Sequence, residues 1–237
     1  MAEPWLISNA ETLTRLAEIL AARGIKPPTD QEIDGYSPDE PGHPHFHRQQ
    51  RITVALSRWT TATPPRYQHA AATDPTVIAW AADVIANPDN ASSLLITGTT
   101  GTGKTYEAFG ALKLIAAHGL KDYRLIATTT ADLYGNLRPT GSAGASEQGL
   151  KRLCEIPLLL LDDLGSAKTS EWTEEITYRL INHRYNQCLP TIFTSNLPPR
   201  AATGPDLTST LGERIASRLA EMVTVVPMAG ADRRRAA

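Results

Sequence analysis

The chain has 237 residues, of which 41% are hydrophobic, and its formal net charge is −2 at pH 7. This length suits one α/β domain of ordinary size with a smaller region beside it. The weak net charge argues against a globally basic protein that coats DNA, although it allows a local basic groove. No apolar run approaches the roughly 20 residues that span a bilayer, and no signal pattern opens the chain, so we expect a cytoplasmic protein without a membrane partner.

The N-terminal region is expected to be helical and to be followed by a linker. Asn9 is a typical N-cap for an amphipathic helix to about Arg23, and Gly24 follows it. The apolar side of this helix either packs on its own chain or docks on a partner protein. The segment from Lys26 to Pro44 is rich in Pro, Asp, Glu and Gly without periodicity, which is typical of a linker.

Histidines and arginines follow this linker. His43, His45 and His47 alternate, so on an extended chain all three could face one side and bind a metal. No cysteine or carboxylate stands at ligand spacing, however, and a solvated linker is the alternative. Residues Arg48–Trp59 form a plausible basic helix, whose arginines are either solvated or contact nucleic acid or an acidic partner: Arg48, Arg51 and Arg58.

The remainder of the chain has the pattern of an α/β domain. Asp74 and Pro75 are typical of a helix start, and that helix is expected to run to about Asn87. Short apolar runs then alternate with helical segments, which implies right-handed crossovers and a parallel sheet covered on both faces. We expect five strands, at Leu94–Thr97, Arg124–Ala127, Leu158–Leu161, Thr191–Thr194 and Val223–Val226.

A phosphate-binding loop follows the first expected strand. The pattern G-x-x-x-x-G-K-[ST] is filled by Gly98, Thr99, Thr100, Gly101, Thr102, Gly103, Lys104 and Thr105. Glycines let backbone N–H groups surround a triphosphate, Lys104 can reach the β and γ phosphates, and the Thr105 hydroxyl can ligate Mg²⁺. A helix begins directly after the loop, so its N-terminal dipole adds to the binding of phosphate.

Polar residues end two later strands. Asp162 and Asp163 follow the strand Leu158–Leu161, at the edge where open α/β sheets bind ligands. We expect Asp162 to hold Mg²⁺ and Asp163 to orient or deprotonate the attacking water. Asn196 ends the next strand and is expected beside the γ-phosphate, although turn chemistry before Pro198 is the alternative. The two cysteines, at positions 154 and 188, lack CxxC spacing and are interpreted as buried thiols.

These motifs together resemble the AAA+ ATPases of the DnaC/IstB-type helicase-loader branch. The resemblance spans roughly residues 64–235 and includes Leu158–Gly165, Asn182–Tyr185, Thr194–Leu197 and Leu211–Leu219. It implies a P-loop NTPase fold with a five-stranded parallel sheet of order 5-1-4-3-2, without a C-terminal lid, and with ATP and Mg²⁺ as cofactors. It also implies that Arg214 is an arginine finger, with Arg218 as the alternative, and that Arg234 is a sensor-2 arginine that contacts nucleotide.

The resemblance also implies partners. In the family, the segment between the second strand and the paired acids contacts single-stranded DNA, and here it holds Tyr134, Arg138, Lys151 and Arg152. A Gly/Ser/Ala-rich stretch from Thr140 to Gly149 is expected to be a flexible loop. Many members carry a cysteine zinc module near the N-terminus, which the first 153 residues of this chain cannot form, since they contain no cysteine.

The sequence therefore predicts two regions, a helical partner-binding region at residues 1–63 and an ATPase domain at residues 64–237. The expected function is that of an ATP-dependent helicase loader, a homo-oligomer that hydrolyses ATP at shared sites and binds a replicative helicase. An alternative is a transposition helper of the IstB type, which acts on duplex DNA with a transposase. A small-molecule kinase is a third possibility that the P-loop alone allows, but it has no evident use for Asn196 or Arg214.

Overall fold

The computed structural model describes residue 22, residues 37–138 and residues 143–232, and these divide into two units between Gln49 and Gln50. The helix expected at residues 9–23 lies outside the described residues, except for Ala22. Within the described ranges, no helix combines the length and apolar character needed to cross a membrane.

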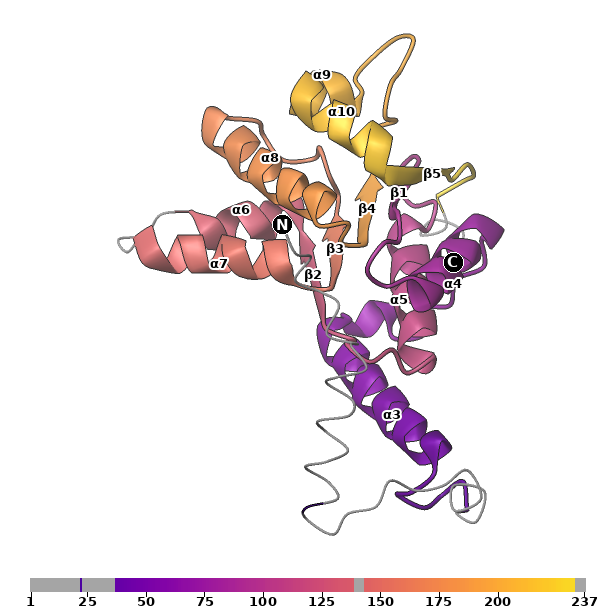
Figure 1. Cartoon of the computed structure of the whole chain (residues 1–237). Coiled ribbons are helices and arrows are strands. Elements are labelled where there is room, and N and C mark those ends of the chain that lie inside the picture. The colour runs from indigo at the N-terminus through magenta and orange to yellow at the C-terminus, as the bar shows by residue number, and fades with distance from the viewer. Residues whose placement is uncertain (1–21, 23–36, 139–142, 233–237) are drawn as a thin grey trace. The chain divides into compact units, whose positions relative to one another are not determined.

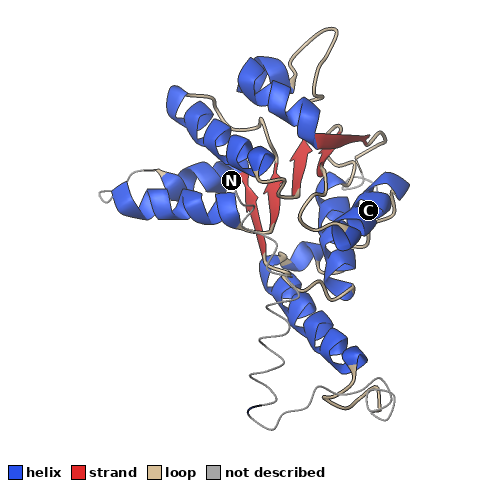
Figure 2. Cartoon of the chain, viewed as in Figure 1, coloured by secondary structure: helices blue, strands red, loops and turns tan. Residues whose placement is uncertain are grey.

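Among the described residues of the second unit, five parallel strands form one sheet (Figure 2), in the order β2-β3-β4-β1-β5. This order confirms the expected one, read from the opposite edge. The strands lie within two residues of the expected bounds, at β1 Ser93–Thr97, β2 Leu125–Thr129, β3 Leu158–Asp162, β4 Thr191–Ser195 and β5 Val223–Pro227.

Alternating strand residues enter two separate cores, one on each face of the sheet. Leu94 and Ile96 pack into the first core, whereas Leu95 between them packs into the second. Because side chains of a strand alternate between faces, an uninterrupted apolar run supplies both cores at once. Helices lie on both sides of the sheet, one group on each side (Figure 1).

The first core lies beneath three helices, α3 Pro44–Ala62, α4 Pro75–Ala86 and α5 Lys104–Ala117. Asp74 caps α4 as expected, since its side chain accepts the N–H groups of Thr76 and Val77. The sequence leaves the arginines of the basic helix either solvated or in contact with a partner, and two of them instead bond to carbonyls of this chain. Within the second unit, Arg51 donates to the Gly119 carbonyl at 2.9 Å and Arg58 to the Tyr123 carbonyl at 2.8 Å.

The start of α3 also changes the interpretation of the histidines. The helix begins at Pro44, so His45 and His47 lie on a helix rather than on an extended chain. Residues two apart on a helix are separated by about 200° around its axis and do not share one side. In the part of the chain that the structure describes, no three metal-binding side chains gather into a group.

The second core is covered by α6 Thr130–Leu137, α7 Ala143–Glu155, α8 Glu171–Asn186, α9 Leu207–Leu211 and α10 Glu213–Met222. The prediction of a flexible loop at Thr140–Gly149 is wrong from Ala143 onward, because α7 begins there. Alanine at two of its positions and an apolar side with Leu150 and Cys154 favour a helix that packs on α8. Cys154 is buried as expected, whereas Cys188 is exposed and has a left-handed φ of 49°.

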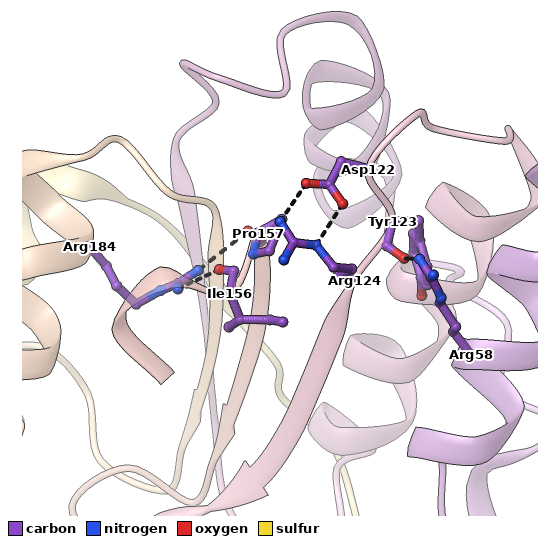
Figure 3. A network of polar contacts seen from close by, with 7 residues as sticks. All are labelled: Arg58, Asp122, Tyr123, Arg124, Ile156, Pro157 and Arg184. Atoms are coloured by element: carbon purple, nitrogen blue, oxygen red, sulfur yellow. Dashed lines mark hydrogen bonds and ion pairs between the residues drawn. The ribbon is translucent and has the colours of Figure 1, made fainter. Parts of the chain in front are cut away.

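One buried arginine joins the N-terminal ends of two strands to the end of α7. Arg184 of α8 is fully buried, and burial lowers the pKa of its guanidinium to about 9. Figure 3 shows that its guanidinium faces the carbonyls of Ile156 and Pro157. Its hydrogen-bond acceptors are the Thr191 hydroxyl and the carbonyls of Leu153, Cys154, Ile156, Pro157 and Pro190.

Candidate nucleotide-binding site

The polar ends of three neighbouring strands meet at one edge of the sheet. Asp162 ends β3, Asn196 follows β4, and the loop from Gly98 follows β1, which lies beside β4 in the sheet. These residues line one cavity of about 470 Å³ together with the start of α5. The fold therefore brings the phosphate loop, both acids and Asn196 into one site, as the strand pattern predicts.

The loop between β1 and α5 has the conformation of a phosphate cradle. Gly101 and Gly103 have φ angles of 86° and 101°, a region that favours glycine. A side chain at Gly101 would also collide with Asp232, because an added Cβ would lie 1.8 Å from its Oδ1 atom. Gly103 directly precedes the first residue of α5, so the helix begins where the loop ends. The positive end of the helix dipole of α5 therefore faces the cavity.

Lys104 is held at the base of this cavity and is only 6% exposed. Its ammonium donates to the carbonyls of Gly98 and Thr99, both at 2.8 Å, and to Oδ1 of Asn196 at 2.9 Å. The predicted phosphate-binding cation and the predicted γ-phosphate residue therefore lie in direct contact. A terminal phosphate bound to one of them lies within reach of the other.

Thr105 and Asp162 also meet in the cavity. The Thr105 hydroxyl donates to Oδ1 of Asp162 at 3.0 Å, with Oδ2 at 3.3 Å. A carboxylate and a hydroxyl are hard oxygen ligands of the kind that Mg²⁺ prefers. Burial raises the pKa of the Asp162 carboxyl, and the negative charge of Asp163 acts in the same direction. The hydroxyls of Thr194 and Thr105 and the charge of Lys104 oppose that rise.

Thr194 connects the two acids, a role that the sequence pattern does not reveal. Its hydroxyl donates to Oδ1 of Asp162 and accepts the backbone N–H of Asp163 at 3.0 Å. Asp163 has a left-handed φ of 56°, unusual for a residue that is not glycine. This turn directs the chain away from β3 immediately after Asp162, and both carboxylates line the same cavity.

Arg66 and Tyr67 also line the cavity, although the sequence pattern does not single them out. They belong to η1, a short 3-10 helix at Pro65–Tyr67, and the Tyr67 ring stacks on Phe109 of α5. The only sequence signal at this point is the pair of prolines that interrupts the chain. The approach of η1 to the phosphate loop depends on tertiary packing.

The two candidate finger arginines differ in their surroundings. Arg214 is exposed near the start of α10 and is not among the residues that line the cavity. Arg218 lies one turn later, where its Nε atom donates to Oδ1 of Asn182 at 2.6 Å. Its guanidinium also lies over the rings of Tyr178 and Tyr185. Arg218 is thus engaged within its own chain, and Arg234 lies outside the described residues.

The expected DNA-contacting residues fall on α6 and α7. Tyr134 is buried, contacts the Thr177 hydroxyl and packs edge-on against Trp172, so its ring is not available to stack on a base. Arg138, Lys151 and Arg152 are exposed, and Lys151 lies 3.8 Å from Glu155 in an exposed ion pair. Such pairs contribute little to stability.

The sheet order, the phosphate loop after β1 and the acids after β3 define the chain as a P-loop protein with an AAA+ fold. The family model of IstB-like ATP-binding proteins matches residues 46–236, and the chain belongs to this family. The replicative helicase loader DnaC of Buchnera aphidicola subsp. Schizaphis graminum is 28% identical over 134 residues, which are 55% of this chain and 51% of that protein.

Two further comparisons agree with this assignment. The replicative helicase loader DnaI of Bacillus subtilis is 28% identical over 107 residues, covering 45% of this chain and 33% of that protein. A crystal structure of the DnaC helicase loader aligns with a TM-score of 0.57 and 27% identity, over 70% of this chain and all of that one. The chain thus spans about half the length, or less, of the curated relatives it matches.

Proposed function

We propose that this protein is an ATP-dependent helicase loader that acts in DNA replication as a cytoplasmic protein. The observation that carries the proposal is the contact of Lys104 with Asn196 and of Thr105 with Asp162 in one cavity. The likeness to proteins named replicative helicase loaders supports the choice of partner.

We propose that the cavity binds ATP and hydrolyses it to ADP and phosphate. The cradle is formed by Gly98, Thr99, Thr100, Gly101, Thr102, Gly103, Lys104 and Thr105. Thr105 and Asp162 would hold Mg²⁺, which supplies positive charge against the developing charge of the transferred phosphoryl group. Asp163 accepts the proton of the attacking water, and Asn196 orients that water and the γ-phosphate.

The active form is proposed to be a homo-oligomer in which Arg214 enters the site of a neighbouring subunit. Arg214 is exposed and outside its own cavity, which supports a role in trans. Arg218 is already engaged with Asn182, which favours Arg214 over the alternative. A guanidinium that reaches the γ-phosphate stabilises the transition state and is worth about 10³–10⁵ in rate. Arg234 is proposed to contact nucleotide as a sensor-2 residue.

We propose that exposed cations of the α6–α7 segment bind single-stranded DNA. The residues are Arg138 at the end of α6 with Lys151 and Arg152 on α7. Tyr134 is left out because its ring is buried. Contacts of this kind neutralise phosphates, so binding should weaken steeply as salt is raised.

Residues 1–63 are proposed to bind the helicase. Contacts within α3 favour the residues before Gln50 for this role. Ala55 and Trp59 of α3 are buried in the first core, and the Trp59 indole donates to the Phe109 carbonyl at 3.0 Å. A partner-binding segment that can be removed without damage to the core therefore ends before Gln50.

A second candidate is a transposition helper that acts on duplex DNA with a transposase, and the matched family favours it, since that family is named for IstB. Two measurements separate the candidates. A helicase loader co-elutes with the replicative helicase of its host and binds single strands in the presence of ATP. A transposition helper binds duplex DNA and the transposase instead, and that result would replace the first proposal.

The experiment on the site itself uses Lys104→Ala with circular dichroism as a control for folding. Removing the ammonium leaves the phosphates without their buried cation, so we expect ATP affinity to fall at least tenfold and hydrolysis to disappear. A folded variant with wild-type affinity for ATP would contradict the assignment of the cradle.

A further inference from the structure

We propose that Arg66 binds the nucleoside end of the nucleotide, meaning the base, the ribose and the α-phosphate that ATP and ADP share. The inference rests on the proposed ATP site and deepens it. In this role Arg66 sets the affinity for nucleotide and takes no part in the cleavage of the γ-phosphate. Three observations carry it: the fixed position of η1, the direction in which the cavity extends, and the surroundings of the Arg66 side chain.

The segment that carries Arg66 is held firmly against α5. The Tyr67 ring stacks on Phe109 with 5.2 Å between the ring centroids and 15° between the planes. The Tyr106 hydroxyl donates to the His69 carbonyl at 2.7 Å. Farther along, the chain crosses α5 at Gly110, where an added Cβ would lie only 2.2 Å from the backbone nitrogen of Ala72. The backbone at Arg66 is therefore fixed in position relative to α5.

The cavity has a γ-phosphate end and an opposite end. Asn196 and Asp162 mark the first end, through their contacts with Lys104 and Thr105. Tyr106 is the next residue of α5, and its side chain points instead to the segment after η1. Successive residues on a helix are about 100° apart, so the chain of lining residues turns from the acids toward Arg66. We infer that the part of the nucleotide beyond the β-phosphate extends in that direction.

The Arg66 guanidinium is suited to such a ligand. The side chain is exposed at the cavity, and it makes no hydrogen bond or ion pair with any residue in the described ranges. A guanidinium can donate two parallel hydrogen bonds to a phosphate, and its flat face can stack on a purine. Both modes act on parts that ATP and ADP have in common.

The alternative is that Arg66 reaches the γ-phosphate within its own subunit. That role would make its contribution specific to ATP and would lower the rate of hydrolysis. A residue at the nucleoside end contributes equally to ATP and ADP, and its loss raises KM with little change in kcat. The comparison of ATP with ADP therefore tests the position of the side chain directly.

The experiment measures Kd for ATP and ADP by displacement of a fluorescent ADP analogue from the full chain, together with steady-state hydrolysis. For Arg66→Ala we expect both Kd values to rise by about tenfold and by the same factor, because a charge-assisted contact of this kind is lost. At saturating ATP, kcat should fall less than about twofold. The matched control is Arg124→Ala. Arg124 is exposed and, with its partner Asp122, lines a different cavity, so the Kd values of this variant should stay at the wild-type level.

The outcomes are distinct. A loss of affinity for ATP but not for ADP, or unchanged Kd values for both, would overturn the inference about Arg66. If Arg66→Ala does not fold, Arg66→Lys decides, since it keeps the charge and loses the planar fork, and we expect an equal but smaller rise in both Kd values. Wild-type protein that binds neither nucleotide would instead contradict the proposed ATPase function.

Discussion

Replacing Arg184 by Met should strongly destabilise the protein without touching the candidate nucleotide site. Arg184 is fully buried, and its hydrogen bonds go to five backbone carbonyls and one hydroxyl. Methionine nearly matches the length of the aliphatic part but supplies no donor. The carbonyls cannot be replaced by mutation, so they would remain buried without this partner.

The expected magnitude follows from that count. A buried acceptor left without a partner costs about 1–3 kcal/mol, and removing one member of a buried charged network costs about 3–5 kcal/mol. We expect the free energy of unfolding to fall by about 3–5 kcal/mol, because some carbonyls will recruit water and the desolvation of the charge is relieved. For a domain of this size, that corresponds to a decrease of about 6–20 °C in Tm.

The assay is urea unfolding followed by circular dichroism, with Arg179→Met as the matched control on the same helix. Arg179 forms an exposed ion pair with Glu147, and its side chain is 41% exposed, so its loss should cost less than about 1 kcal/mol. A decrease below about 1 kcal/mol for Arg184→Met would refute the reasoning. It would mean that these carbonyls find equivalent partners without the guanidinium.

Three further predictions concern the candidate site. Asp163→Asn should keep ATP affinity and reduce hydrolysis by at least about 10²-fold. Asp162→Asn should also raise the Mg²⁺ concentration needed for hydrolysis. Equal losses of ATP binding in both variants would contradict these roles. Because burial raises the pKa of Asp162, Mg²⁺-dependent nucleotide binding should weaken as pH falls, starting at a higher pH than for an ordinary carboxyl near 3.8. The same shift makes the free protein less stable as pH rises from 3.8 through the raised pKa, and Asp162→Asn should remove that slope. Mixtures of Arg214→Ala with Lys104→Ala should recover ATPase activity at interfaces that join an intact cradle to an intact finger, and no recovery at any ratio would exclude a trans arrangement.

The strands and the core of the site could be predicted from sequence because they depend on local patterns. A run such as Leu158–Leu161 is apolar throughout, so it indicates a strand buried on both faces, and the acids after it must lie at the sheet edge. The phosphate loop likewise places its own glycines, lysine and threonine by short-range geometry. These features do not depend on distant residues.

Other features depend on contacts between residues far apart in the chain. Arg66 approaches the phosphate loop only because Tyr67 stacks on Phe109, 42 residues later, and no local pattern encodes that contact. The contacts of Arg51 and Arg58 could not be predicted because their acceptors are backbone carbonyls, which have no sequence signature. The same holds for α7, where small residues suggested a loop until the packing of Leu150 and Cys154 favoured a helix.

If the cavity binds ATP as proposed, the contact between Lys104 and Asn196 offers a way to sense the terminal phosphate. An ammonium has three donors, and here its acceptors include two backbone carbonyls and Oδ1 of Asn196. A phosphate that binds Lys104 competes for these hydrogen bonds, and the Asn196 amide is the acceptor that can rotate away without moving the backbone. Under the proposed function, its release leaves an amide beside the γ-phosphate on the first residue after β4, where the segment that leads to α9 begins. Thr194 of the same strand donates to Asp162, so under the proposed function β4 positions both the residue beside the terminal phosphate and a partner of the expected Mg²⁺ ligand.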